Sequence, residues 1–317
     1  MQLQTIVPIK PLKNTVTYNA KIISIGSCFA VNMSKQFQNF QFQNTINPLG
    51  ILFHPVAILR LIDFAVNNKI FDEKDVFLHN EIWSCFDAHS DLNEIEQKDL
   101  LFQLNQKTKN FKKDLIEATH CILTFGTAWV YRNKSSNQLV ANCHKLPQNQ
   151  FDKELLSIED CQTTIFEIEK NIRKLNPEIQ IIYTLSPVRH IKDGFVENQQ
   201  SKAHLISSLQ THLNQNANCN YYFPSYEIMM DELRDYRFYA KDLIHPNELA
   251  VEYIWRKFVE YCIDTQEYPT MKMVDEVQKG LAHRPFNPYS DGYQYFLEAL
   301  SEKIDLLLEK YPFMNFR

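Results

Sequence analysis

The sequence predicts an α/β fold, in which a doubly wound parallel sheet is flanked by helices and followed by a C-terminal helical extension. Three short runs, residues 21–25, 120–125 and 179–185, are largely apolar, as in strands that are buried on both faces of a parallel sheet. Segments with helical spacing of apolar residues separate these runs, and strands that alternate with helices favour a parallel sheet. With 317 residues and 44% hydrophobic content, the chain can bury a substantial core.

The predicted elements follow one another in a regular order. Strands are expected at residues 21–25, 40–46, 120–125, 179–185 and 220–223, and hairpins at 75–86 and 130–141. Helices are expected from Ser27 to about 38, from Pro55, at 93–118, from Ser157 to before Asn176, at 199–216 and after Asn247. Pro55 suits the first position of a helix, and Ser157 with Asp160 has the spacing of a capping box.

We expect one α/β domain over residues 1–265, with insertions near 75–118 and 130–145. Residues 266–317 are expected to form a C-terminal helical extension that packs on it, with two helices joined by the loop 284–289. That loop and the start of the second helix carry Phe286, Tyr289, Tyr293, Tyr295 and Phe296. These aromatic side chains are expected to pack in the core of the extension, with a sugar-stacking wall as the alternative.

Composition narrows the classes of partner and cofactor. The net charge of −5 and the lack of a dominant Lys/Arg cluster argue against nucleic acid. No apolar run approaches the roughly 20 residues of a membrane span, and the start of the chain lacks a signal-peptide pattern. Seven scattered cysteines indicate reduced thiols, so a cytoplasmic location is expected. No Cys/His spacing typical of a metal site is present, and no metal or other cofactor is expected.

A glycine and a serine follow the first predicted strand, in the sequence Gly26-Ser27-Cys28-Phe29-Ala30. Beyond Ser27, apolar residues at 31, 33 and 37 stand among polar ones, which indicates a helix. Ser27 thus lies where a strand turns into a helix N-terminus, and the free N–H groups and the helix dipole there favour a developing negative charge. This position suits a nucleophilic serine, and it equally suits a serine that only caps the helix.

Further polar motifs also follow predicted strands or precede a helix: Gly50, Gly126-Thr127, residues 186–190, and the loop with Asp242 and His245. The carboxyl ends of parallel strands meet at one edge of the sheet, where the ligand sites of doubly wound folds lie. His245 can act there as the base for Ser27, while Asp242 orients the imidazole. Taken alone, the Asp-x-x-His pair also fits a capping aspartate beside a chance histidine.

Residues 26–30 spell G-S-C-F-A, and the chain resembles the GSCFA family, which is similar to the SGNH/GDSL hydrolase superfamily. Five further motifs match: Asn47-Pro48-Leu49-Gly50, Gly126-Thr127-Ala128-Trp129, Asn142-Cys143-His144-Lys145, Ser186-Pro187-Val188-Arg189-His190-Ile191-Lys192-Asp193-Gly194 and Asp242-Leu243-Ile244-His245-Pro246. The resemblance spans about residues 20–265 and implies an SGNH-type, flavodoxin-like sheet. Several ordered motifs are far more specific than any single one.

The resemblance implies a role for each matching residue. Ser27 takes the place of the nucleophile, and Asp242 and His245 match the last motif of the superfamily. The N–H groups of Ser27 and Gly50 would form the oxyanion hole. The third motif departs from the superfamily pattern, because an asparagine donor is missing from residues 126–129. Thr127 is one substitute and Asn142 is another, and loss of such a donor can cost about 10²–10³-fold in rate.

The matching motifs also supply candidate substrate-binding residues, namely Asn47, Gly126, Trp129, His144, Arg189 and His190. Alternatives remain for several of them: His144 can begin a solvated loop, and Arg189 and His190 can pin their own loop. Cys28 is a second candidate nucleophile, since a thiol at a helix N-terminus has a lowered pKa. Packing inside the first helical turn is the other reading of this cysteine.

The sequence therefore predicts a serine hydrolase that cleaves an acetyl or other short ester of a small molecule or glycan through an acyl-enzyme. An O-acyltransferase would use the same residues with a sugar hydroxyl as the acceptor. A non-catalytic binding protein with a degenerate site is the third hypothesis, because of the missing asparagine. The oligomeric state is not predicted.

Overall fold

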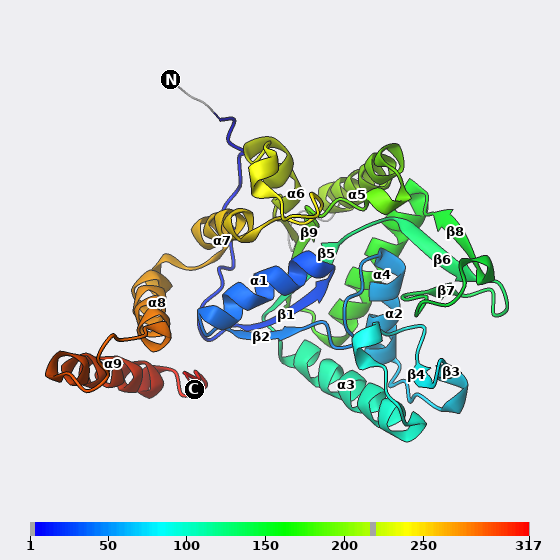
Figure 1. Ribbon diagram of the computed structural model, residues 1–317. Coiled ribbons are helices and arrows are strands. Elements are labelled where there is room, and N and C mark those ends of the chain that lie inside the picture. The colour runs from blue at the N-terminus through cyan, green and yellow to red at the C-terminus, as the bar shows by residue number, and fades with distance from the viewer. Residues whose placement is uncertain (1–3, 216–219, 317) are drawn as a thin grey trace.

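A computed structural model describes residues 4–215 and 220–316 (Figure 1) and confirms the predicted α/β fold. In the described residues the central sheet consists of parallel strands β1 (Lys21–Gly26), β2 (Gln43–Ile46), β5 (His120–Phe125), β9 (Gln180–Leu185) and β10 (Asn220–Tyr222). They lie in the order β10-β9-β5-β1-β2. Counted along the chain within this sheet, this is the order 2-1-3-4-5 of flavodoxin-like folds, with its switch point between β1 and β5.

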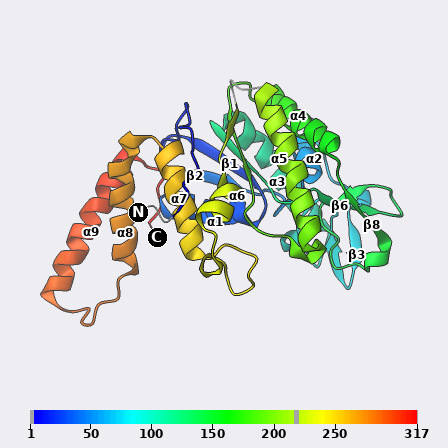
Figure 2. The ribbon, with the colours of Figure 1, turned by 90° about the horizontal axis from the view of Figure 1, so that it is seen from above.

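Helices cover both faces of this sheet (Figures 1 and 2). One face carries α1 (Cys28–Asn39) and α7 (Glu248–Cys262), and the other carries α2 (Pro55–Val66), α3 (Gln97–Glu117), α4 (Ile158–Leu175) and α5 (Phe195–Gln215). Ile22 and Ile182 pack into the core on the α1 side, whereas Ile23 and Ile181 pack into the opposite core. Because successive side chains of a strand point to opposite faces, burial of both faces explains the continuous apolar runs.

Two small antiparallel insertions flank the sheet. The first is the hairpin of β3 (Phe77–His79) and β4 (Ile82–Ser84), as expected for residues 75–86. The second joins β6 (Trp129–Asn133) to β7 (Leu139–Val140) and to β8 (Phe151–Leu155), a strand that the sequence pattern did not predict. Only Phe151 of β8 is buried, so the strand lacks an apolar run and is held by its ladder with β6.

Short helical turns complete the described chain. They are α6 (Ser225–Glu227), the π-helical turn Ile228–Glu232, and 3₁₀ turns at Glu73–Asp75, Ser90–Leu92, Gln148–Gln150, Ile191–Asp193, Tyr236–Phe238 and Thr265–Glu267.

Three predicted starts differ from the structure by three or four residues. Helix α3 begins at Gln97 rather than 93, because Glu94 instead pairs with Trp83 in an isolated bridge. The second strand begins at Gln43 rather than 40, because Phe40 caps α1 with an N–H bond to the Gln36 carbonyl (3.0 Å) and Gln41 turns the chain with a φ of 61°. Helix α5 begins at Phe195, four residues before its predicted start, and its predicted end at 216 lies outside the described residues.

The C-terminal residues form the two expected helices, α8 (Tyr268–Ala282) and α9 (Asp291–Lys310), which lie side by side (Figure 2). They meet the body of the protein around Tyr18, whose ring centroid lies 5.0 Å from that of Tyr311. The Glu267 carboxylate accepts hydrogen bonds from the backbone N–H of Tyr18 (3.3 Å) and the Tyr311 hydroxyl (3.1 Å). These contacts join the extension to the core beside α7.

The expected core packing of the aromatic residues at 286–296 is wrong for Phe286, Tyr289, Tyr295 and Phe296, which are exposed, whereas Tyr293 is half-buried. Helices α8 and α9 instead meet where Leu300 packs over Gly280: a Cβ at Gly280 would lie 2.6 Å from Leu300 Cδ1. The apolar contact between α8 and α9 is therefore made by helical residues and not by the loop 284–289.

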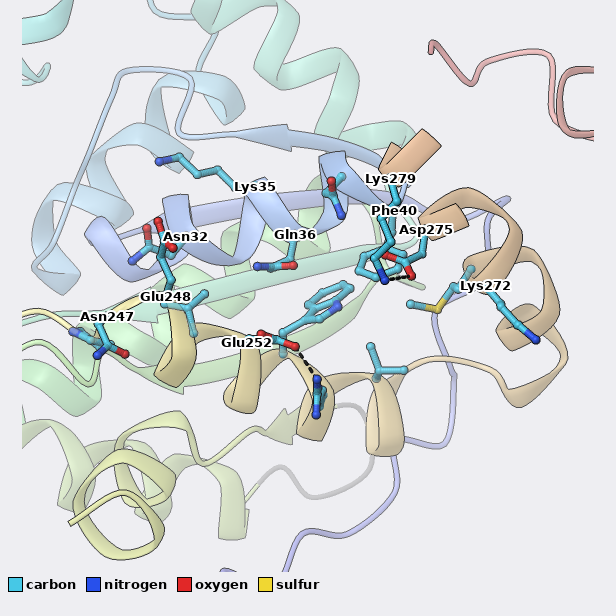
Figure 3. Close-up of a pocket in the computed structure, with 17 residues that line it drawn as sticks. Asn32, Lys35, Gln36, Phe40, Asn247, Glu248, Glu252, Lys272, Asp275 and Lys279 are labelled. Atoms are coloured by element: carbon cyan, nitrogen blue, oxygen red, sulfur yellow. Dashed lines mark hydrogen bonds and ion pairs between the residues drawn. The ribbon is translucent and has the colours of Figure 1, made fainter. Parts of the chain in front are cut away.

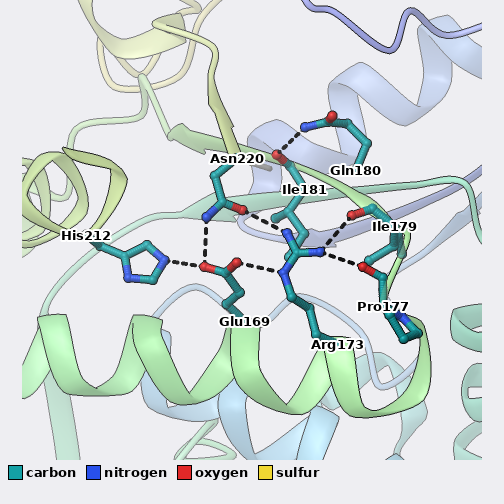
Figure 4. Close-up of polar contacts among 8 residues, drawn as sticks. All are labelled: Glu169, Arg173, Pro177, Ile179, Gln180, Ile181, His212 and Asn220. Carbon is teal, nitrogen blue, oxygen red and sulfur yellow. Dashed lines mark hydrogen bonds and ion pairs between the residues drawn. The ribbon is translucent and has the colours of Figure 1, made fainter. Parts of the chain in front are cut away.

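A polar network joins α4 and α5 to the amino ends of β9 and β10 (Figure 4). The Glu169 carboxylate accepts hydrogen bonds from Arg173 Nε (2.7 Å) and Asn220 Nδ2 (2.7 Å), and it pairs with His212 Nε2 at 2.6 Å. Burial would raise the pKa of Glu169, but these hydrogen bonds lower it to about 2. The network lies at the edge of the sheet opposite the predicted site, so its role is in stability.

None of the helices in the described ranges has an apolar stretch long enough to cross a bilayer. Six of the seven cysteines fall in these ranges and are free thiols, and Cys219 lies outside them.

Candidate active site

The turn from β1 to α1 needs a glycine. Gly26 has a φ of 143°, and a Cβ there would lie 2.1 Å from the carbonyl oxygen of Thr124. This close contact of β1 with β5 presents Ser27 at the switch point of the sheet. Ser27 is the N-cap of α1 and is 2% exposed, and its Oγ accepts a hydrogen bond from the Phe29 N–H (3.3 Å). The N–H of Ser27 donates to the Thr124 carbonyl (3.2 Å).

Asn47 directly follows β2 and lies beside the turn from β1 to α1. Its φ of 39° redirects the chain, and its side-chain Oδ1 accepts the N–H of Gly26 (2.8 Å). Its carbonyl accepts the N–H of Gly50 (2.8 Å), and Gly50 has a φ of 80°. The N–H of Gly50, which the resemblance assigns to the oxyanion hole, is therefore engaged in a turn in this structure.

Asp242 and His245 form a tight pair in the loop before α7. His245 Nδ1 lies 2.6 Å from Asp242 Oδ2, and Asp242 Oδ1 accepts the backbone N–H groups of Ile244 (2.9 Å) and His245 (3.0 Å). The backbone hydrogen bonds and the imidazole lower the pKa of Asp242 to about 2, so the carboxylate is charged at neutral pH. Leu243 has a φ of 60°, which bends the loop so that the two side chains meet.

The loop after β9 connects this pair to the switch point. The backbone N–H and Nη2 of Arg189 donate to the carbonyls of Ile244 (3.4 Å) and Leu243 (3.3 Å). On its other side, His190 Nε2 lies 3.3 Å from the position that a Cβ of Gly126 would occupy. His245, His190 and the carboxyl end of β5 thus lie one after another along the carboxyl edge of the sheet. Strand β5 is the neighbour of β1 in that sheet.

No hydrogen bond joins His245 to Ser27 within the described ranges. His245 Nδ1 is bound to Asp242, the His245 side chain is 41% exposed, and Ser27 Oγ serves as the cap of α1. Because a hydroxyl oxygen can accept one hydrogen bond while it donates another, the bond from the Phe29 N–H leaves the Ser27 hydroxyl proton free for a base. Catalytic hydrogen bonds of unliganded enzymes often have such loose geometry.

Sequence reasoning missed Lys202 of α5, a fully buried lysine behind these loops. Its Nζ donates to the carbonyls of Gly126 (2.6 Å) and Ser186 (2.7 Å), so it ties the loops after β5 and β9 together. Burial lowers its pKa to about 7. The pKa of His190 is lowered to about 3, mainly by burial and secondly by the charges of Lys202 and His245. This imidazole is therefore neutral.

The helical spacing of the core-facing positions in α5 could have revealed that Lys202 is buried. The buried residues of α5 include Asn198, Ser201, Lys202, Leu205, Ser208, Leu209 and His212. These positions follow a helical stripe, so a lysine on an otherwise core-facing stripe marks a buried charge.

The other residues of the third motif serve structural contacts. Thr127 Oγ1 pairs with Ser201 Oγ (2.9 Å) and accepts the Trp129 N–H (3.1 Å). The indole of Trp129 donates to the Glu197 carbonyl (3.2 Å) and lies under Lys153 Nζ, 4.5 Å from the ring centroid. Their polar atoms are thus occupied in this structure.

Asn142 and His144 lie in the hairpin insertion. Asn142 Oδ1 accepts the His144 N–H (2.8 Å), and His144 Nε2 lies 2.7 Å from the Cys85 carbonyl. The His144 imidazole meets the rings of Phe77 and Phe86 edge-on. These contacts join the two insertions and place neither side chain in contact with Ser27.

Cys28, the alternative nucleophile, lies in the first turn of α1. Burial raises the pKa of its thiol, which opposes the thiolate form that attack requires.

A groove of about 920 Å³ runs between α1, α7 and α8 (Figure 3). One end is lined by Pro246 and Asn247, which directly follow His245. Its walls carry Asn32, Lys35, Gln36 and Asn39 of α1, Glu248, Glu252, Trp255 and Arg256 of α7, and Lys272, Asp275 and Lys279 of α8. The groove thus begins next to the Asp242–His245 loop. Its polar side chains alternate with apolar ones, namely Phe40, Val251, Trp255, Val259 and Met271, and its lining does not include Ser27. Within residues 4–215 and 220–316, no group of three or more His, Cys, Asp or Glu side chains is placed to hold a metal ion.

Among solved structures, the chain is similar to an acetyl xylan esterase (Est2A) from the rumen bacterium Butyrivibrio proteoclasticus, with 11% sequence identity and a TM-score of 0.34. The match covers 78% of this chain and 65% of that one, so this chain spans less than two thirds of the esterase's length. Comparison with curated proteins gives no match.

Two family models match the chain. The model described as "GSCFA domain protein, C-terminal domain" covers residues 274–317, which hold most of α8 and all of α9. The model described as "GSCFA family" covers residues 21–258, from the first residue of β1 into α7. The second match includes the sheet, the Ser27 turn and the Asp242–His245 loop. Because it extends over well more than half of the sequence, the chain belongs to the GSCFA family.

Proposed function

We propose that this protein is a serine hydrolase of the SGNH type, which cleaves an acetyl or other short ester of a small molecule or glycan through an acyl-enzyme. The observation that carries the proposal is the Asp242–His245 pair, joined at 2.6 Å at the edge of the sheet where Ser27 begins α1. A charged carboxylate on Nδ1 fixes the imidazole tautomer that leaves Nε2 free to accept a proton.

Acylation begins when Ser27 Oγ attacks the ester carbonyl carbon. His245 Nε2 takes the hydroxyl proton as the Oγ–C bond forms, and the electron pair of the C=O bond moves to the oxygen. Collapse of this oxyanion breaks the bond to the leaving alkoxide, which receives the proton from His245. Asp242 remains ionised throughout and stabilises the imidazolium.

Deacylation repeats these steps with water. His245 takes a proton from the water, whose oxygen bonds to the acyl carbon, and returns it to Ser27 Oγ as the acid leaves. A sugar hydroxyl in place of water would make the protein an O-acyltransferase. Shielding of the acyl-enzyme from water decides between the two outcomes.

The groove between α1, α7 and α8 supports a glycan as the alcohol part of the substrate. Amide and charged side chains of both signs line its walls, among them Gln36 of α1 and Glu252 of α7, which lie on facing helices (Figure 3). Such donors and acceptors suit a chain of hydroxyl groups. In this proposal residues 1–265 form the catalytic domain, and the extension 266–317 contributes α8 to the substrate groove.

The test is hydrolysis of p-nitrophenyl acetate and longer p-nitrophenyl esters by the wild type and by Ser27→Ala and His245→Ala. Both variants are expected to lose at least about 10³-fold in kcat. Cys28→Ala and His283→Ala, an exposed histidine after α8, are matched controls and are expected to keep the activity. Fluorophosphonate labelling is expected at Ser27 and not at Cys28.

Equal activity of the wild type and Ser27→Ala would exclude the serine mechanism. Absence of activity and of labelling in the wild type would favour a binding protein, for which the covered Ser27 hydroxyl is a specific argument. With an acetylated oligosaccharide, Gln36→Ala is expected to raise KM, whereas Gln38→Ala, on the exposed side of α1, is not. Faster loss of the acyl group on addition of a sugar acceptor would identify a transferase.

A further inference from the structure

Some buried polar side-chain atoms have no hydrogen-bond partner in the described part of the chain. They are Tyr18 Oη, Asn47 Nδ2, Thr108 Oγ1, His144 Nδ1, Tyr183 Oη, Arg189 Nε and His190 Nε2. Buried donors are usually satisfied, because an unmade hydrogen bond costs about 1–3 kcal/mol. Two of these atoms, on Asn47 and His190, lie next to the glycines at the carboxyl ends of β1 and β5. Because both atoms lie at the candidate site, a bound ligand could supply their hydrogen-bond partners.

Asn47 is held in place by the other three of its polar groups. Its N–H donates to the Ser24 carbonyl (3.0 Å), its carbonyl accepts the N–H of Gly50 (2.8 Å), and Oδ1 accepts the N–H of Gly26 (2.8 Å). The last bond fixes the plane of the amide against the residue that precedes Ser27. Nδ2 is thus the remaining polar atom of a rigid side chain beside the nucleophile.

The backbone donors that the resemblance assigns to the oxyanion are already engaged. The N–H of Ser27 continues the ladder to the Thr124 carbonyl (3.2 Å), and the N–H of Gly50 closes the turn with Asn47 (2.8 Å). The substitute Thr127 has its hydroxyl on Ser201. A developing oxyanion at Ser27 therefore needs a donor that is not committed to the fold.

We propose that Asn47 supplies the side-chain N–H that stabilises the oxyanion formed when Ser27 attacks the substrate. This role rests on the proposed esterase function and makes Asn47 a catalytic residue. Asn47, from the loop after β2, would then replace the side-chain oxyanion donor that is missing from residues 126–129. The amide N–H is neutral, fixed before the reaction, and shielded from water, which are the conditions under which such a donor contributes most.

The sharpest variant is Asn47→Asp, because it separates the two functions of the side chain. The carboxylate retains an oxygen for the N–H of Gly26 and replaces the NH₂ group by a second oxygen. We expect kcat for p-nitrophenyl acetate to fall by about 10²–10³-fold with KM changed only a few-fold. The melting temperature is expected to fall, because the second carboxylate oxygen is buried without a donor, so kcat is measured well below it. A purely structural asparagine would give the opposite pattern, a retained kcat.

Two further variants control for charge and for the rival donor. Asn44→Asp introduces the same charge three residues earlier, in β2. Asn44 contacts Ser24 and Ser34 rather than the site, and this variant is expected to keep kcat. His190→Gln tests the other unpartnered nitrogen, and a larger loss of kcat there than in Asn47→Asp would overturn the assignment to Asn47. A kcat of Asn47→Asp within threefold of the wild type overturns the proposal, and so does an equal loss in Asn44→Asp. Lack of activity in the wild type would refute the proposed function itself, which is a different result.

Discussion

Replacing the buried Lys202 by methionine tests the electrostatic account of the site loops. In the folded protein the ammonium is enclosed, and its hydrogen-bond partners are the carbonyls of Gly126 and Ser186. Burial lowers its pKa from 10.5 to about 7, which corresponds to about 5 kcal/mol against the charged form. Lys202→Met removes this cost and leaves two carbonyls without a donor, at about 1–3 kcal/mol each.

The pH dependence of the free energy of unfolding separates the effect of Lys202 ionisation from that of its hydrogen bonds. Between about pH 7 and 10.5 the unfolded state binds more protons at Lys202 than the folded state, so the free energy of unfolding rises with pH. For these two pKa values the wild type gains about 2 kcal/mol between pH 7 and pH 9, and less than about 0.5 kcal/mol between pH 6 and pH 7. The variant lacks this contribution, and its lost carbonyl hydrogen bonds shift stability equally at every pH.

Urea denaturation of both proteins from about pH 6 to about pH 9 measures this difference. Subtracting the variant from the wild type cancels the other titrating groups. Lys241→Met, at an exposed lysine, is the matched control and is expected to follow the wild type. If the difference between the wild type and Lys202→Met stays constant within about 0.5 kcal/mol over this range, the lysine does not carry the lowered pKa and the reasoning fails.

Two further predictions concern stability. Gly26→Ala places a Cβ 2.1 Å from the Thr124 carbonyl oxygen at a φ of 143°, so we expect a loss of more than about 3 kcal/mol in urea denaturation; a loss below about 1 kcal/mol would show that the β1–β5 contact relaxes easily. Glu169 has a pKa lowered from 4.5 to about 2, so its contribution is present above pH 4.5 and is lost as the pH falls through 2. Glu169→Gln is expected to lower stability by about 3 kcal/mol at pH 7 and to converge with the wild type near pH 2, and parallel curves for the two proteins would contradict this.

Local patterns were sufficient for the sheet and for the edge at which the candidate residues lie. The continuous apolar runs at β1, β5 and β9 indicate burial on both faces, which a doubly wound parallel sheet with helices between its strands provides. The carboxyl edge then follows from topology. Asp242 and His245 are near neighbours in sequence, so their contact at 2.6 Å depends on one loop and was predictable from their spacing.

The failures of prediction share one cause, which is that they depend on contacts between distant segments. Strand β8 exists through its ladder with β6, and the aromatic loop is exposed because α8 and α9 meet at Gly280 and Leu300. The bond from the Gly26 N–H to Asn47 Oδ1 also joins residues that are far apart in the chain, and it forms only after β1 and β2 have come together. By contrast, the turn that the Gly50 N–H closes on the Asn47 carbonyl fits the local Asn-Pro-Leu-Gly pattern.

The sequence by itself therefore determined the strand–Gly26–Ser27–helix turn, the Asp242–His245 pair and the edge at which both lie. Only the tertiary structure decided which donors remain available there. It commits the N–H of Ser27 to Thr124 and buries Lys202 behind the loops. Among residues 4–215 and 220–316 it leaves Nδ2 of Asn47 without a partner. The physical reason is that a side chain's type is local, whereas its free hydrogen-bonding capacity is what remains after every other segment has packed against it.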